Sequence, residues 1–333
     1  MSQIWVFHSI EVVMTMQVSR SRLFALVATL GLLFGSATIS MAANPVSNAD
    51  ELVAQHLNSI APAAVRAGFK TRVVQGPAEF RVMVGGAGTT EGKSFLVSDG
   101  NKLVFVVKLP TNTYRGEQFT FDGQKDSVAF STPKQTRSAF GSFVFVQDAV
   151  IREGLLGGTM TTAWPLLNLN ERKAKLKFEG LKKVDGQQLY ELRYHPRKSS
   201  DLEISLYFDP ETYRHVETVY SYSSPTGLAD ADPNFNGADP NMAAAPGGMG
   251  AALQQEGAPT SETNTARQFL NRYRLQEKFS DFKTIDGVTV PTQDDIQFTQ
   301  ELQNGRTTLW DWQLKSLDVS LNAGVDPKNF QVK

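Results

Sequence analysis

Polar and apolar residues alternate along most of this chain, in short runs that turn residues separate. The clearest run places an apolar side chain at every second position from Leu202 to Phe208. Because successive side chains of a strand point to opposite faces, this period of two predicts strands with one buried face. The run at 102–109 is almost continuously apolar, which predicts a strand covered on both faces.

Five dipeptides mark turns between such runs: Asp99-Gly100, Asp122-Gly123, Asp185-Gly186, Asp286-Gly287 and Asn304-Gly305. An Asp-Gly or Asn-Gly pair is the strongest short-range sign of a hairpin, because the central residues of a type I′ turn need positive φ. Turns spread over this much of the chain predict a mainly β (α+β) fold with one large antiparallel sheet. They disfavour a fold built on parallel strands.

Helical signals occur at two places. Asn48 followed by Glu51 fits a capping box and predicts an N-terminal helix. Residues 138–168 are rich in apolar residues and glycine, and the spacing of Phe140, Phe143 and Val144 predicts an amphipathic helix. We expect residues 138–168 to lie as a helical cover across one face of the sheet. The glycines at its centre would act as a hinge, and these are Gly154, Gly157 and Gly158.

Residues 224–262 lose this periodicity and are rich in Ala, Gly, Pro, Asn and Asp. A stretch of that length and composition is a disordered insertion or a functional loop, and we predict the first. Asp232, Asn234 and Asn236 match the first half of an EF-hand loop, but Ala243 stands where the bidentate glutamate belongs. We therefore predict no metal site in this segment.

The N-terminus has the pattern of an export signal. Arg20 and Arg22 precede an apolar run from Leu23 to Phe34, and a small-x-small cleavage site ends at Ala42. We predict a signal peptide over 1–42 and a single domain over 43–333, in a periplasmic or secreted protein. A short membrane anchor is the alternative, although the run is shorter than the ~20 residues that span a bilayer.

Composition narrows the function further. The chain has no cysteine, which excludes a disulfide scaffold, a thiolate metal site and a lipid-modified N-terminal cysteine. Its formal net charge is −1, so nothing indicates a nucleic-acid or anionic-membrane partner. We expect no stable membrane insertion once the signal is cleaved.

No catalytic motif is present. The three histidines after the signal do not have zinc-site spacing; we predict a surface position for His56 and structural or exposed positions for His195 and His215. Asp294 and Asp295 are adjacent on a predicted strand and should point to opposite faces, a poor geometry for an acid–base pair. We predict a protein that is not an enzyme and has no cofactor and no metal.

Apolar side chains offer the only candidate site. Trp310 and Trp312 alternate along the last long strand and should share a face. Together with the cover they either line an apolar chamber or fill a solid core, since both use the same side chains. The candidate ligand-binding residues are Phe140, Phe143, Val144, Ile151, Leu155, Leu156, Trp164, Trp310 and Trp312.

Four segments resemble the LolA/LolB-like lipoprotein carriers, a group that includes outer-membrane lipoprotein-sorting proteins and the related RseB-like sensor domains. They are Tyr114–Glu117 with Phe121–Gly123, Arg152–Gly158, Phe282–Pro291, and Asn322–Pro327 with Phe330. The chain departs from the compact carriers in its greater length and in the insertion at 224–262.

The resemblance implies an incomplete β-barrel that cups helices and leaves a cavity for acyl chains. It therefore implies an exported, non-enzymatic binding protein that sequesters a lipid or the acyl chains of a lipoprotein, for transport across the periplasm. The alternative is an envelope sensor or scaffold that uses the same fold, with a solid core, to bind a protein partner.

Overall fold

The computed structural model describes residues 46–111, 114–130, 137–198, 201–232 and 270–332, which belong to one compact unit. The signal peptide predicted over 1–42 lies outside the described residues, as do residues 233–269 of the chain. The beginning of the predicted insertion is ordered structure, because a strand continues to Ser224 and a short helix follows it.

The helices come in three groups: α1 (Ala49–Ile60) and α2 (Ala63–Arg66) at the start; α3 (Ala139–Val146), α4 (Ala149–Arg152), η1 (Gly158–Met160), η2 (Pro165–Asn168) and α5 (Leu169–Arg172) in the middle; α6 (Leu228–Ala231) and η5 (Pro327–Phe330) later. The strands before the cover are β1 (Thr71–Val84), β2 (Gly88–Asp99), β3 (Lys102–Lys108), β4 (Glu117–Phe121) and β5 (Asp126–Phe130). Those after it are β6 (Lys175–Val184), β7 (Gln187–His195), β8 (Glu203–Phe208), β9 (His215–Ser224), β10 (Asn271–Ser280), β11 (Lys283–Ile285), β12 (Val288–Val290), β13 (Gln293–Glu301), β14 (Thr307–Lys315) and β15 (Asp318–Leu321).

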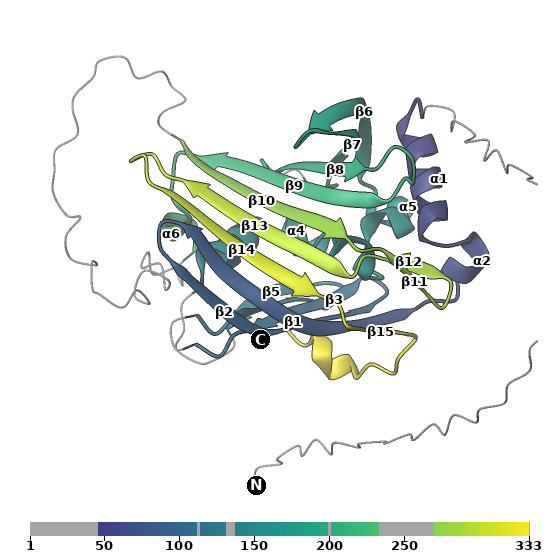
Figure 1. Cartoon of the computed structure of the whole chain (residues 1–333), viewed down its shortest axis with the longest axis horizontal. Coiled ribbons are helices and arrows are strands. Elements are labelled where there is room, and N and C mark those ends of the chain that lie inside the picture. Colours follow the sequence, from purple (N-terminus) through teal and green to yellow (C-terminus); the bar gives the residue numbers. More distant parts are fainter. Residues whose placement is uncertain (1–45, 112–113, 131–136, 199–200, 233–269, 333) are drawn as a thin grey trace, which may run out of the picture. The chain divides into compact units, whose positions relative to one another are not determined.

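One 13-stranded antiparallel sheet dominates the fold, as predicted. Its order is β5-β4-β3-β2-β1-β14-β13-β10-β9-β8-β7-β6, with β15 paired to the first part of β1 and a separate β11-β12 hairpin. Figure 1 shows the long strands from β9 to β1 lying side by side. The path ends at β5 and β6, which do not pair with each other, so the sheet is an incomplete barrel.

All five predicted turns connect neighbouring antiparallel strands. Asp185-Gly186 and Asp286-Gly287 have positive φ at both residues, as a type I′ turn requires. At Asp99-Gly100 only the glycine does. The dipeptides therefore predicted the hairpins correctly, although the turn type differs between them.

The long strand β1 runs without interruption through Gly76. A Cβ at Gly76 would lie 1.7 Å from the carbonyl oxygen of Lys315, so only glycine lets the β14–β15 connection pass so close. At this point the chain passes from β14, which pairs with the later part of β1, to β15, which pairs with its first part.

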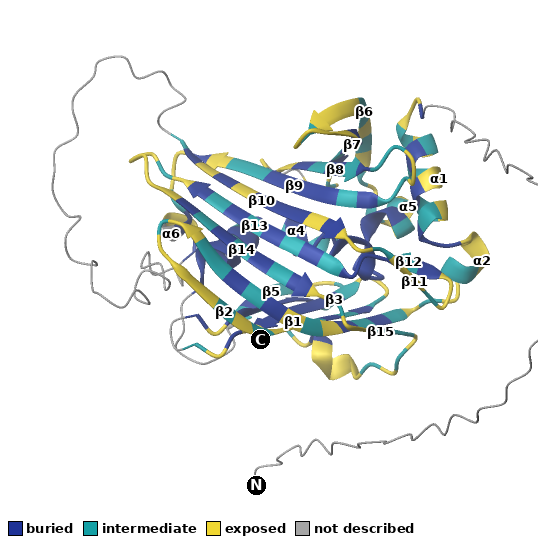
Figure 2. Ribbon diagram, in the orientation of Figure 1, coloured by how far each residue is buried: buried dark blue, intermediate teal, exposed yellow. Residues whose placement is uncertain are grey.

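Burial follows the strand pattern, as Figure 2 shows for the central strands. Inward positions of β8 from Leu202 to Phe208 are at most 5% exposed, which confirms the alternation. The strand β3 is covered on both faces, because η5 contacts it on the side opposite the main core and Val104 is 5% exposed.

The helix α1 begins where the capping signal placed it. The Asn48 side chain accepts a hydrogen bond from the backbone N–H of Glu51 at 2.9 Å, and the Glu51 carboxylate accepts one from the N–H of Ser47. The buried face of α1 carries Leu52, His56 and Ile60. The predicted surface position of His56 is therefore wrong: the side chain is 0% exposed.

Within the described residues no helix combines the length and apolar character needed to cross a membrane.

Candidate functional site

The cover lies against the inner face of the sheet and consists of several short helices. The predicted amphipathic helix is α3, which ends at Val146 and is buried from Ala139 to Val144, so it has no polar face there. The chain turns again at α4 and then passes through the glycines to η1 and η2. Pro165 occupies the first turn of η2, a position where its missing N–H costs no helical hydrogen bond.

The nine candidate residues come together in one buried cluster. Phe140 packs between Trp312 and Phe119, each with ring centroids 5.0 Å away, and Phe143 packs on Phe298 at 5.3 Å. None of the nine side chains is more than 4% exposed. In this arrangement the cover and sheet pack against each other, and a ligand chain between them requires the cover to move.

Polar contacts fasten the beginning of the cover. The buried Glu117 carboxylate accepts hydrogen bonds from the N–H and hydroxyl of Ser138, at 2.9 and 2.7 Å, and from the Tyr114 hydroxyl at 3.1 Å. Burial raises the pKa of Glu117, an effect that these hydrogen bonds oppose. Gly141 lies directly on this carboxylate, since a Cβ there would be 1.9 Å from Glu117 Oε1.

A second carboxylate also holds α3. Asp232 accepts a hydrogen bond from the Ser142 hydroxyl at 2.8 Å and forms a buried ion pair with Arg137. Asp232 therefore serves as an anchor for the cover. No cluster of three or more metal-ligating side chains exists among the described residues, and Asn234 and Asn236 lie outside them.

Arg72 of β1 fastens the later part of the cover. Its guanidinium donates from Nη1 to the carbonyl oxygens of Thr159 and Thr161. The side chain is 3% exposed, and burial lowers the pKa of Arg72 to about 10, which leaves it charged at neutral pH. Next to it, Ser98 of β2 accepts a hydrogen bond from the N–H of Thr162 at 2.9 Å.

An aromatic and histidine cluster supports Trp164. The indole N–H donates to His56 Nε2 at 3.0 Å, and the ring stacks on His215 with centroids 4.4 Å apart. His56 Nδ1 lies 3.0 Å from the carbonyl oxygen of Tyr213. Burial lowers the pKa of His56 to about 4 and that of His215 well below its ordinary value.

Two more carboxyl groups lie beneath the glycines. Glu277 Oε1 accepts a hydrogen bond from the N–H of Gly157 at 2.9 Å, and Oε2 accepts one from the Tyr220 hydroxyl at 2.8 Å. Burial raises the pKa of Glu277 to about 7. Asp294 is 1% exposed on the same face, and burial together with the charge of Glu277 raises its pKa well above the ordinary value. Asp295 points to the other face, as predicted.

The three proposed hinge glycines all have left-handed φ. Gly154 also approaches the carbonyl oxygen of Ala163, which a Cβ would meet at 2.2 Å. These positions therefore require glycine in the closed arrangement. Movement about them stays a prediction.

Sequence reasoning missed the polar residues that fasten the cover. Arg72, Glu277 and Asp294 each occupy an inward position of their strand. Two positions further along, Val74 after Arg72 and Ile296 after Asp294 are buried apolar residues on the same face. A charged residue in phase with an apolar stripe is the signal that would have found them.

Comparison with family models and with curated sequences gives no significant match. Among solved structures, the chain is similar to a LolA superfamily protein from Nitrosomonas europaea, with 12% identity and a TM-score of 0.41 over 86% of this chain and 99% of that one. A domain from Vibrio parahaemolyticus, described as outer membrane lipoprotein-sorting, has 12% identity and a TM-score of 0.40 over 84% of this chain and 95% of that one.

A chain of the MucA/MucB complex from Pseudomonas aeruginosa shows 11% identity and a TM-score of 0.22 over 83% of this chain and 100% of that one. The proposals below rest on the contacts within this chain.

Proposed function

We propose that this chain is an exported, non-enzymatic binding protein that takes up acyl chains of a lipid or lipoprotein between its sheet and its cover. The ligand would contact the nine apolar residues named above, once the cover has moved. Carriage across the periplasm would follow from the reversibility of that movement.

The manner in which the cover is attached carries this proposal. Side chains of the sheet hold its later part through a few hydrogen bonds. Arg72 donates two to carbonyl oxygens, and Ser98 and Glu277 each accept one from an N–H of the cover. No described residue between Ala139 and Arg172 belongs to the sheet. The cover can therefore separate without breaking any strand pairing.

Exchanging the hydrogen bonds of the cover for a buried acyl chain is favourable in free energy. Net hydrogen bonds contribute about 0.5–1.5 kcal/mol each, or about 1.5–3 kcal/mol when one partner is charged. Burying an acyl chain returns ~0.8 kcal/mol per CH₂ group, so a long chain offsets the loss of several such bonds. The aromatic contacts of Phe140 and Phe143 would be exchanged for contacts with the chain.

A reversible lock tests this proposal. The chain has no cysteine, so a Ser98→Cys/Thr162→Cys double variant contains a single possible disulfide, placed between β2 and the cover. Binding of a fluorescent fatty acid and of a diacylated lipopeptide should fall at least about tenfold in the oxidised form. Reduction should restore it, and the reduced protein serves as its own control.

Equal binding by the oxidised and reduced forms would show that the chains do not enter beneath the cover. Absence of binding in the reduced form and in the unmodified protein would contradict acyl uptake altogether.

The second candidate function is that of an envelope sensor or scaffold that binds a protein partner. One observation favours it: the nine candidate residues already pack ring against ring and are at most 4% exposed, as in a solid core. A protein that refuses both acyl probes, yet stays fully folded by circular dichroism, would support this alternative.

A further inference from the structure

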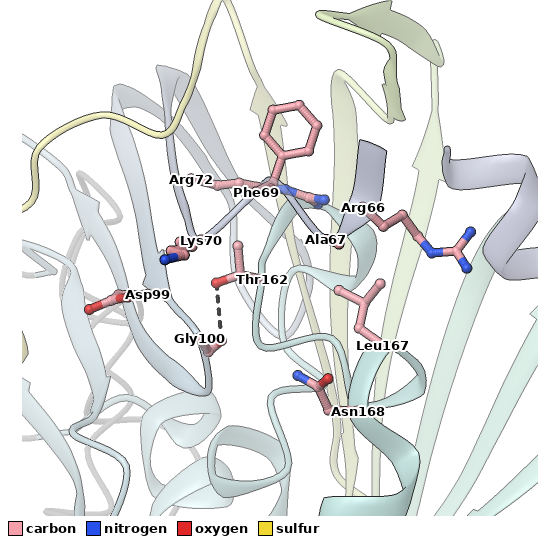
Figure 3. Close-up of a pocket in the computed structure, with 10 residues that line it drawn as sticks. All are labelled: Arg66, Ala67, Phe69, Lys70, Arg72, Asp99, Gly100, Thr162, Leu167 and Asn168. Atoms are coloured by element: carbon pink, nitrogen blue, oxygen red, sulfur yellow. Dashed lines mark hydrogen bonds between the residues drawn. The ribbon is translucent and has the colours of Figure 1, made fainter. Parts of the chain in front are cut away.

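A surface cavity of about 470 Å³ lies where the start of β1 meets the end of the cover. Its walls come from four places: the segment after α2, the start of β1, the β2–β3 turn and the residues around η2. Figure 3 shows the side chains that surround it, with Lys70 and Asp99 at the left and Leu167 and Asn168 at the right. The Arg66 guanidinium points away to the right and donates to the carbonyl oxygens of Leu57 and Ala61.

The charge of this cavity differs from that of the whole chain. Three cationic side chains line it, Arg66, Lys70 and Arg72, against one carboxylate, Asp99. The chain as a whole carries a formal charge of −1. Asp99 lies 3.9 Å from Lys102, which partly neutralises it. The lining therefore has an excess of positive charge.

Arg72 supplies an observation independent of the charge count. Its Nη1 holds the cover, but its Nε is buried and has no hydrogen-bond partner in the structure. Leaving a charged donor unpaired in the interior costs free energy, so this guanidinium retains hydrogen-bonding capacity beside the cavity. The nearby Lys70 is exposed and its ammonium is accessible from solvent.

The cavity also has apolar and neutral polar walls. Phe69 and Leu167 offer apolar contact, and the carboxamide of Asn168 can donate hydrogen bonds. Guanidinium groups suit phosphate oxygens because they present paired donors. The volume exceeds that of a phosphate ion and leaves room for an attached organic group.

We propose that this cavity binds a phosphate ester, with the phosphate between Lys70 and Arg72 and its organic group against Phe69 and Leu167. The phosphate can belong to a soluble ester or to a phospholipid headgroup. This site goes beyond the proposed acyl-chain function and does not depend on it.

Calorimetric titration with glycerol 3-phosphate at low ionic strength tests the site. Lys70→Glu and Asn168→Asp place a new negative charge on opposite walls, and each should weaken binding about tenfold or more. The matched control is Lys183→Glu, because Lys183 is exposed on β6 at the far end of the strand order. It should bind like the unmodified protein.

Flotation with vesicles of phosphatidylglycerol and phosphatidylcholine, mixed 1:3, separates the two sources. Flotation that Lys70→Glu and Asn168→Asp weaken, and Lys183→Glu does not, assigns the site to a lipid headgroup. Glycerol 3-phosphate binding with this same pattern of variants, but without flotation, assigns it to a soluble ester. The proposal fails if neither probe binds, or if all three variants lose binding equally.

Discussion

The indole N–H of Trp164 donates to Nε2 of His56 over 3.0 Å, and this contact fixes the protonation of a fully buried histidine. Since Nε2 accepts a hydrogen bond, Nδ1 carries the hydrogen and donates a hydrogen bond to the carbonyl oxygen of Tyr213. The imidazole is therefore neutral. One hydrogen-bonded chain thus connects the cover, α1 and Tyr213 in the turn between β8 and β9.

This neutral histidine predicts a stability that falls in acid. The pKa of His56 is lowered to about 4 from 6.5, so between these values the unfolded chain binds a proton that the folded protein does not. Stability should fall as pH drops from about 6.5 to 4, by up to about 3 kcal/mol from this group. Urea unfolding at pH 7 and pH 5 measures the difference.

His56→Leu should lower stability at pH 7, because it leaves the buried indole N–H of Trp164 without its acceptor, and should weaken the acid dependence. His195→Leu is the control, since His195 is exposed. An unchanged acid dependence in His56→Leu would contradict the assignment.

The raised pKa of Asp294 predicts that stability depends on pH with the opposite sign. Its pKa is raised in the folded protein, which therefore holds a proton that the unfolded chain releases above pH ~4. Stability from this group should decline as pH rises. Asp294→Asn has no charge to bury and should be more stable than the unmodified protein at pH 8, by at least about 1 kcal/mol, with the gain vanishing near pH 4.

Thermal unfolding across this pH range measures the effect. Asp295→Asn is a matched control, because the carboxyl of Asp295 points to the outer face of the sheet and is only half-buried. If Asp294→Asn destabilises the protein at pH 8 as well, the buried carboxyl has a bonding role that outweighs its charge.

Gly141→Ala should destabilise the protein even though alanine favours helices. The new Cβ would meet Glu117 Oε1 at 1.9 Å, and this carboxylate cannot swing aside because Ser138 and Tyr114 hold it. Overpacking of this kind costs about 1–3 kcal/mol. Gly324→Ala, where nothing lies within 4 Å, should be close to neutral. Denaturant unfolding of both variants would reveal a clash if only the first loses stability.

Arg72→Met should loosen the later part of the cover without unfolding the sheet. It removes two charge-assisted hydrogen bonds to Thr159 and Thr161, so amide hydrogen exchange over residues 157–162 should accelerate about tenfold or more. Arg81→Met is the control, since Arg81 lies on the same strand but pairs with Glu79 at the surface. Equal exchange in both variants would mean that other contacts hold the cover.

The sheet was predictable because its signals are local. The Asp-Gly and Asn-Gly turns depend only on the φ preference of adjacent residues, and the alternation in β8 depends only on the pleat. The buried charges were harder, because Glu277 is satisfied by Gly157, which is far from it in sequence. Such a partner is fixed by tertiary packing and not by spacing.

His56 shows a pattern that was present but given too little weight. Leu52, His56 and Ile60 stand at i, i+4 and i+8, so the histidine continues the apolar stripe of α1. The prediction that α3 is amphipathic was wrong for a different reason. Its surroundings, β5 and α6, cover the side that an isolated amphipathic helix would leave to water.

The strand order has a consequence for how the chain acquires its structure. Among the described strands, β1 to β5 form one meander and β6 to β10 with β13 and β14 form another. The two are joined in the sheet by the pairing of β1 with β14. Loop closure over that separation is slow compared with hairpin formation. The sheet is therefore whole only after β1 has paired with β14. Until then the edge of β1 opposite β2 has no strand partner.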